Sequence, residues 1–166
     1  MAAVTLQGNT INTNGDLPAV GSAAPDFKLT DGELNDKSLS DFAGKKLLLN
    51  IVPSLDTGVC AMSTKKFNEA VKDLSNTQVL IISADLPFAQ SRFVQQESLS
   101  NVTTLSEMRN RNFAKDFGVL IQDGPLAGIM ARAVVVIDEN GKVTYNELVP
   151  EITQEPDYDK ALSALA

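Results

Sequence analysis

The stretch Asn50-Ile51-Val52-Pro53-Ser54-Leu55-Asp56-Thr57-Gly58-Val59-Cys60 sets the arrangement of the chain, because it joins a buried strand to an amphipathic helix. Residues 47–52 form a near-continuous apolar run, which is typical of a strand buried on both faces. Pro53 cannot donate to a sheet ladder and therefore ends the strand. Thr57 is a helix-capping residue type, so a helix is predicted to begin just before Cys60.

The helix that follows places this cysteine on its inward face. Apolar residues recur at helical spacing at Phe67, Ala70, Val71 and Leu74. Cys60 precedes Phe67 by two helical turns and so shares its face. A thiol in the first turn of a helix, facing the sheet, is the best candidate for chemistry in this sequence.

Composition excludes several classes of protein. The 166 residues are predicted to form a single domain, residues 1–166, and their formal charge of −7 argues against a nucleic-acid partner. No stretch approaches the roughly 18 apolar residues that a membrane crossing requires. The first residues lack a basic region followed by an apolar core, which favours a cytoplasmic over a periplasmic location.

The reactive side chains are few. A single cysteine excludes an internal disulfide and a cysteine-rich zinc site. The absence of histidine excludes Ser-His-Asp and Cys-His mechanisms and most catalytic zinc sites. Any nucleophile must therefore be activated by something other than imidazole.

The remaining pattern alternates buried strands with helices and ends in a hairpin and a helix, which indicates an α/β fold with a mixed sheet. This order of elements is compatible with a thioredoxin-like arrangement. The elements expected are a hairpin over residues 4–13, a short strand at 27–30, a helical turn at 38–42, buried strands at 78–83 and 133–137, a short strand at 102–105, helices at 87–97, 108–117 and 157–165, and an edge strand at 142–149.

The spacing Pro53-x-x-x-Thr57-x-x-Cys60 resembles the active-site signature of the peroxiredoxin family, and the wider stretch resembles its bacterial thiol peroxidase subfamily. The resemblance covers essentially the whole chain. The other matching segments are residues 83–93, 123–126, 131–138 and 151–158.

This resemblance implies a thioredoxin-like fold with an N-terminal β-hairpin, and a thiol-dependent peroxidase acting on hydrogen peroxide and organic hydroperoxides. Cys60 would be the peroxidatic residue and would become a sulfenic acid. Arg132 would stabilise its thiolate, Thr57 would hydrogen-bond the thiolate and the peroxide, and Pro53 would shield the pocket from water. No metal, haem or flavin is expected, the reductant would be an external thiol or thioredoxin-like protein, and a homodimer is implied.

Elementary chemistry agrees with these roles, since the thiolate is the reactive form and a helix N-terminus and a guanidinium both favour an anion. Each residue also has a structural interpretation. Cys60 could be an inert buried side chain, Thr57 an N-cap that accepts from the Cys60 amide, and Arg132 an edge residue that reaches solvent.

One position departs from the family. Most thiol peroxidases of this type carry a resolving cysteine where this chain has Val94. Val94 is either natural, with the sulfenic acid of Cys60 reduced by an external partner, or an engineered change that holds the reduced state. Two further functions stay open at this point: a peroxide sensor that passes oxidation to a partner without efficient turnover, and a non-catalytic thioredoxin-fold module.

Overall fold

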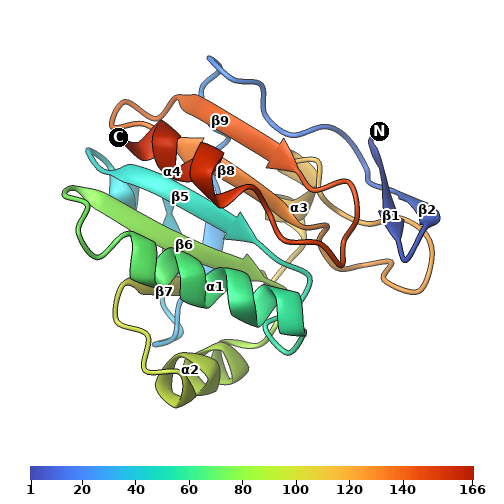
Figure 1. Ribbon diagram of the computed structural model, residues 1–166, viewed down its shortest axis with the longest axis horizontal. Helices are drawn as coiled ribbons and strands as arrows, with labels where there is room; N and C mark the ends of the chain where they lie inside the picture. The colour runs from blue at the N-terminus through green and yellow to red at the C-terminus, as the bar shows by residue number, and fades with distance from the viewer.

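A computed structural model describes all residues from 1 to 166, and its centre is a seven-stranded mixed sheet in the order β4-β3-β7-β6-β5-β8-β9 (Figure 1). The strand of the deciding stretch, β5, lies between β6, to which it is parallel, and β8, to which it is antiparallel. The elements in chain order are β1 (Ala3–Leu6), β2 (Asn9–Asn12), β3 (Lys28–Thr30), β4 (Asp36–Ser38), the 3-10 helix η1 (Leu39–Phe42), β5 (Lys46–Ile51), α1 (Gly58–Ala70), β6 (Thr77–Ser83), α2 (Pro87–Gln96), β7 (Val102–Ser106), α3 (Asn112–Asp116), β8 (Ala133–Ile137), β9 (Val143–Leu148) and α4 (Tyr158–Leu165).

The sheet separates two apolar clusters. Successive side chains of β5 point to opposite faces, so Leu47 and Leu49 join one cluster while Leu48 joins the other. The first cluster includes Phe42 of η1, Phe113 of α3 and Phe117, which directly follows α3. The second includes the inward residues of α1 and α4, and Figure 1 shows these two helices on the same side of the sheet. Both faces are therefore covered, as the apolar runs of β5, β6 and β8 predict.

The predicted class, a thioredoxin-like α/β fold with an N-terminal hairpin, is confirmed. The hairpin β1–β2 turns at Gln7 and Gly8, whose φ values of 49° and 85° suit a two-residue turn. It lies beside the main sheet, toward the side where α1 begins (Figure 1). Pairing of Val134 with Glu147 and of Ala133 with Leu148 places β9 at the sheet edge, as expected.

Two local predictions were wrong. The helix expected over 108–117 shortens to α3, because Ser106 Oγ accepts from the Met108 amide at 3.1 Å and Asn110 Oδ1 accepts from the Asn112 amide at 2.9 Å, which favours turns. The strand β4 was missed because its residues are polar. The helical spacing of apolar residues continues to Leu74, but α1 ends at Ala70.

A buried carboxyl group lies where β7 ends. The side chain of Glu107 is only 2% exposed, and its Oε2 accepts from the Ala114 amide at 3.3 Å. Its Oε1 has no hydrogen-bond partner and lies 3.7 Å from Arg111 Nε. Burial raises the pKa of Glu107 to about 7, against the opposing effect of Arg111. The folded protein therefore holds a proton at this site that the unfolded chain releases at lower pH.

We expect this proton to make folding stability depend on pH. Because the folded pKa is raised from 4.5, stability falls as pH rises from about 4.5 to about 7, by roughly 2–3 kcal/mol. Glu107→Gln removes this contribution, so the difference in unfolding free energy between wild type and variant should change by that amount between pH 5 and pH 8 in urea titrations. The exposed Glu139→Gln is the control and should leave the pH dependence unchanged. Parallel pH curves for wild type and Glu107→Gln would contradict the assignment.

Candidate functional site

The start of α1 presents free backbone donors. Thr57 occupies the N-cap position with an extended backbone (φ −100°, ψ 146°), and its carbonyl accepts from the Ala61 amide at 3.0 Å. The amides of Gly58, Val59 and Cys60 make no backbone hydrogen bond, as expected for the first residues of a helix. The first turn holds no acidic residue. It therefore carries the partial positive charge that favours a nearby anion.

Cys60 is the third residue of this helix, and its side chain is fully buried. It packs in the second apolar cluster with Val52, Leu55 and Phe67, on the inward face that its spacing predicts. The Cys60 carbonyl accepts from the hydroxyls of Ser63 and Thr64 at 3.1 and 2.9 Å, but the sulfur itself makes no hydrogen bond. Direct bonds from Thr57 or Arg132 to the sulfur therefore stay a prediction.

A cavity of about 430 Å³ adjoins this turn. It brings together three of the four predicted site residues, Pro53, Thr57 and Arg132, from the end of β5, the start of α1 and the start of β8. Cys60 is not part of its wall, although its chain neighbours Gly58 and Val59 are. The other lining residues are Leu6, Ser54, Leu126, Ile129, Ile152 and Thr153.

Arg132 is the charged group of this cavity, and its side chain is only 2% exposed. The interpretation of Arg132 as an edge residue reaching solvent is therefore wrong. Its Nε donates to the Ile152 carbonyl at 2.8 Å, while its Nη1 is buried without a hydrogen-bond partner. An unpaired buried donor on a charged group is costly, so an oxygen acceptor beside this nitrogen would be stabilising.

The Thr57 hydroxyl does not make the capping bond that its structural interpretation predicted. It donates to the Ser54 carbonyl at 2.9 Å and makes no capping bond to the Cys60 amide. Its proton is thus already committed, while its lone pairs remain able to accept a hydrogen bond. In this arrangement the Thr57 hydroxyl can accept a hydrogen bond from a hydroperoxide while it donates to the Ser54 carbonyl.

Sequence reasoning missed Asp85, which holds the segment before α1. Its carboxylate accepts from Ser54 Oγ at 2.7 Å, from the Leu55 amide at 2.8 Å and from Ser83 Oγ at 2.8 Å. The strands β5 and β6 are parallel, so the residues after their carboxyl ends meet at one edge of the sheet. An acidic residue directly after the second buried strand was the signal that could have revealed this contact.

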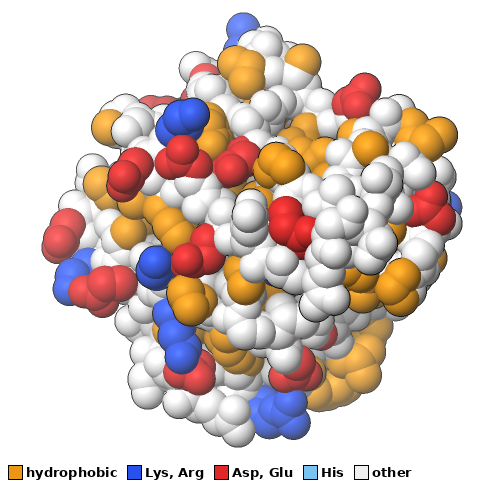
Figure 2. All heavy atoms as spheres, turned by 45° about the vertical axis from the view of Figure 1, so that its right-hand side comes forward, with side chains coloured by type: hydrophobic (Ala, Val, Ile, Leu, Met, Phe, Trp, Pro, Cys, Tyr) orange, Lys and Arg blue, Asp and Glu red, His pale blue; other side chains and the backbone are white.

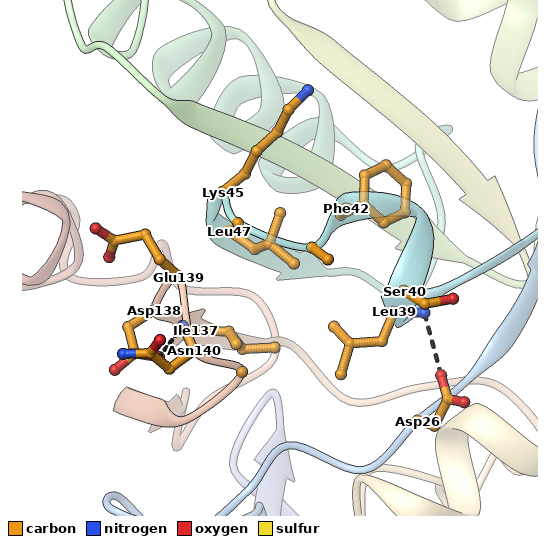
Figure 3. A pocket seen from close by; sticks show the side chains of 13 residues that line it. Asp26, Leu39, Ser40, Phe42, Lys45, Leu47, Ile137, Asp138, Glu139 and Asn140 are labelled. Carbon is orange, nitrogen blue, oxygen red and sulfur yellow. Dashed lines mark hydrogen bonds between the residues drawn. The ribbon is translucent and has the colours of Figure 1, made fainter.

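A second cavity, of about 360 Å³, lies at the opposite end of β5 and is drawn in Figure 3. Two of its three carboxylates accept hydrogen bonds from backbone amides. Asp26 Oδ1 accepts from the amides of Phe27 and Leu39 at 2.8 and 3.1 Å, and Asp138 Oδ1 accepts from the amides of Asn140 and Lys142 at 2.9 Å each. This cavity contains neither a thiol nor an unpaired buried donor.

The molecular surface carries charges of both signs. Figure 2 brings the hairpin side forward and shows Lys and Arg side chains scattered among Asp and Glu, with apolar side chains exposed between them. None of the helices has the length and apolarity that a bilayer crossing requires. No group of three or more His, Cys, Asp or Glu side chains is placed to hold a metal ion.

A thioredoxin-like sheet that presents a buried cysteine in the first turn of a helix, beside a pocket with a buried guanidinium, defines a thiol-based redox protein. Comparison with known proteins identifies the family. The model of the redoxin family matches residues 19–162. The thiol peroxidases of Corynebacterium glutamicum and Mycobacterium bovis are 53% and 55% identical to this chain, over 99% of the chain and 99% of each relative.

Solved structures agree. A peroxiredoxin-like protein from Aquifex aeolicus superposes with a TM-score of 0.93 at 42% identity, covering 99% of this chain and 96% of that one. The thiol peroxidase from Chromobacterium violaceum superposes with a TM-score of 0.92 at 25% identity, with the same coverage. The chain belongs to the redoxin family and, within it, to the peroxiredoxins of the bacterial thiol peroxidase subfamily.

Asp85→Asn tests how far the segment before α1 depends on a single carboxylate. The substitution replaces one carboxylate oxygen with an amide NH2 group, which cannot accept the hydrogen bonds that this oxygen accepts. The loss should lower the free energy of unfolding by about 1–3 kcal/mol. Displacement of Ser54 and Leu55 should slow the oxidation of Cys60 by peroxide about tenfold. Urea titration and stopped-flow oxidation measure the two effects.

Asp56→Asn is the matched control for this change. Asp56 is exposed and its carboxylate makes one long ion pair, with Arg92 at 3.8 Å, so the stability should change by less than about 0.5 kcal/mol. Equal effects of the two substitutions would show that the bonds of Asp85 do not hold the site.

Proposed function

We propose that Cys60 is the peroxidatic residue of this thiol peroxidase and that Pro53, Thr57 and Arg132 form its peroxide site. The observation that carries the proposal is Arg132, a buried guanidinium residue with an unpaired Nη1, which lines a pocket together with Thr57 and the first turn of α1. Thiol-dependent peroxide reduction itself follows from the family. A sensor is not favoured, because the relatives at 53–55% identity carry the name of an enzyme.

The reaction needs no group beyond the residues in place. The Cys60 thiolate attacks the terminal oxygen of a hydroperoxide, an S–O bond forms as the O–O bond breaks, and the other oxygen leaves as an alkoxide or hydroxide that takes a proton from water. Cys60 becomes a sulfenic acid. Arg132 and the free amides of α1 stabilise the thiolate and the negative charge that develops on the leaving oxygen. The Thr57 hydroxyl oxygen accepts a hydrogen bond from the O–H group of the hydroperoxide. Pro53 limits the entry of water.

The pocket also supports a class of substrate. Most of its wall away from Arg132 is apolar and fits an alkyl or aryl tail, so organic hydroperoxides should react in addition to hydrogen peroxide. The apolar side chains of this wall are Leu6, Val59, Leu126, Ile129 and Ile152.

Recycling of Cys60 requires a partner. Val94, on α2, occupies the position of the resolving cysteine, and the chain has no second cysteine to form a disulfide with Cys60. An external thiol therefore attacks the sulfenic acid, releases water and forms a mixed disulfide, which a second thiol reduces. A thioredoxin-like protein is the proposed reductant, the cytoplasm the proposed compartment, and a homodimer the proposed assembly.

The site is tested by stopped-flow oxidation with cumene hydroperoxide and hydrogen peroxide. Cys60→Ser should abolish the reaction. Arg132→Met, which keeps the apolar stem but removes the donors, should slow it about 10²- to 10³-fold. Arg109→Met is the control, because Arg109 is exposed and distant in the fold, and it should retain the wild-type rate. An unchanged rate in Arg132→Met would overturn the proposed site.

Overoxidation is the expected consequence of having a single cysteine. Without a thiol, excess peroxide should add two oxygen atoms to Cys60, giving a sulfinic acid, and intact-mass measurement should detect this product. With dithiothreitol present from the start, the mass should remain that of the free thiol. Finding an unmodified thiol after prolonged exposure to peroxide alone would contradict the prediction.

A further inference from the structure

The segment that follows β9 joins Arg132 to the N-terminal hairpin. The Ile152 carbonyl accepts from Arg132 Nε at 2.8 Å, and the Ile152 amide donates to the Thr5 carbonyl of β1 at 2.9 Å. The Thr5 amide in turn donates to the Pro150 carbonyl at 2.7 Å. A shift of the hairpin relative to residues 150–153 would therefore move the group that orients the guanidinium.

The carboxylate of Glu151 fixes this junction from both sides. Its Oε1 accepts from Thr5 Oγ1 and from the Gly8 amide, both at 2.9 Å, and these donors belong to the hairpin. Its Oε2 accepts from the amide and the hydroxyl of Thr153 at 2.9 and 2.7 Å. One oxygen thus binds the hairpin and the other binds the segment that carries Ile152.

We propose that Glu151 is a positioning residue for peroxide reduction. By holding the hairpin against residues 150–153, it fixes the Ile152 carbonyl that orients Arg132 and also fixes Leu6 in the pocket wall. Glu151 does not line the pocket and touches no reacting atom, so it acts through Arg132. The inference rests on the proposed role of Arg132 in the site.

Glu151 remains ionised between pH 5 and pH 9, so its hydrogen bonds to the hairpin and to Thr153 are present throughout this range. Hydrogen bonds from Thr153, from the Gly8 amide and from Thr5 lower its pKa from 4.5 to about 2. A depressed carboxyl pKa means that the stabilising contact is fully present above about 4.5 and is lost only as pH falls through about 2. The contacts of Glu151 therefore do not change with pH between pH 5 and pH 9, and Glu151 is not a pH switch.

A second carboxylate provides a matched control. Asp123 holds the other strand of the hairpin, because its two oxygens accept from the amide and the side-chain nitrogen of Asn12 at 2.8 Å each. It anchors the hairpin to the loop that carries Leu126, and it makes no bond to residues 150–153. Glu151→Gln and Asp123→Asn each replace a charged acceptor of hydrogen bonds from the hairpin with a neutral amide. Only Glu151→Gln also weakens the bonds to the segment that orients Arg132.

The experiment measures the second-order rate constant of Cys60 oxidation by hydrogen peroxide and by cumene hydroperoxide. Glu151→Gln sets an amide nitrogen against hydrogen-bond donors and should lower both constants about tenfold. Asp123→Asn should retain the hydrogen peroxide constant within about twofold, because a small peroxide does not need the wall that Leu126 provides. Equal losses in the two variants, or an unchanged constant in Glu151→Gln, would overturn the inference.

A double-mutant cycle separates positioning from a general loss of stability. If Glu151 acts through Arg132, adding Glu151→Gln to Arg132→Met should change the rate constant by less than about twofold. An undiminished tenfold effect in the Arg132→Met background would overturn the inference. If Arg132→Met alone leaves the wild-type rate unchanged, the proposed site itself fails instead.

Thr5→Val is the milder variant, to be used if Glu151→Gln does not fold. It removes only the hydroxyl donor on the hairpin and should lower both constants in the same ratio, by a smaller factor. Unchanged constants for both peroxides in Thr5→Val would likewise overturn the inference.

Discussion

The interaction on which this site depends is the bond between Arg132 Nε and the Ile152 carbonyl. Arg132 is 2% exposed and its guanidinium therefore loses most of its hydration, and burial of a charge is tolerated only when neighbouring groups replace the lost water. Here one backbone carbonyl replaces part of it and the Nη1 nitrogen remains unpaired. The fold thus holds a positively charged donor with free hydrogen-bonding capacity at the start of β8.

Strand order explains why this guanidinium lies beside the cysteine helix. In the antiparallel pair β5–β8, Ile51 is opposite Ala133, so the residue before Ala133 lies level with the residue after Ile51. Arg132 therefore emerges at the edge of the sheet where Pro53 ends β5 and α1 begins. The hairpin and residues 150–153 close the pocket from the other side. None of these segments is adjacent to Cys60 in sequence except the first turn of its own helix.

The sequence was informative where the signal is local and periodic. The apolar runs predicted β5, β6 and β8, and the spacing from Cys60 to Phe67 predicted the inward face of α1. Polar elements gave no such signal, so the edge strand β4 was missed. The contacts of Asp85 and Glu151 were also missed, because they join residues about 30 and about 145 positions apart, and no local period reports such pairs.

The hydrogen-bonding state of the pocket wall shows why an acidic chain can stabilise an anion at this place. Each hydroxyl on the wall already donates: Ser54 to Asp85, Thr57 to a carbonyl, and Thr153 to Glu151. The carboxylates near the site are thus occupied in holding loops and do not face the cavity. The donors that remain free are the amides at the start of α1, which carry a partial positive charge, and the terminal nitrogens of the Arg132 guanidinium. The groups beside this turn that can stabilise an anion are therefore backbone amides and a guanidinium, and neither requires an imidazole.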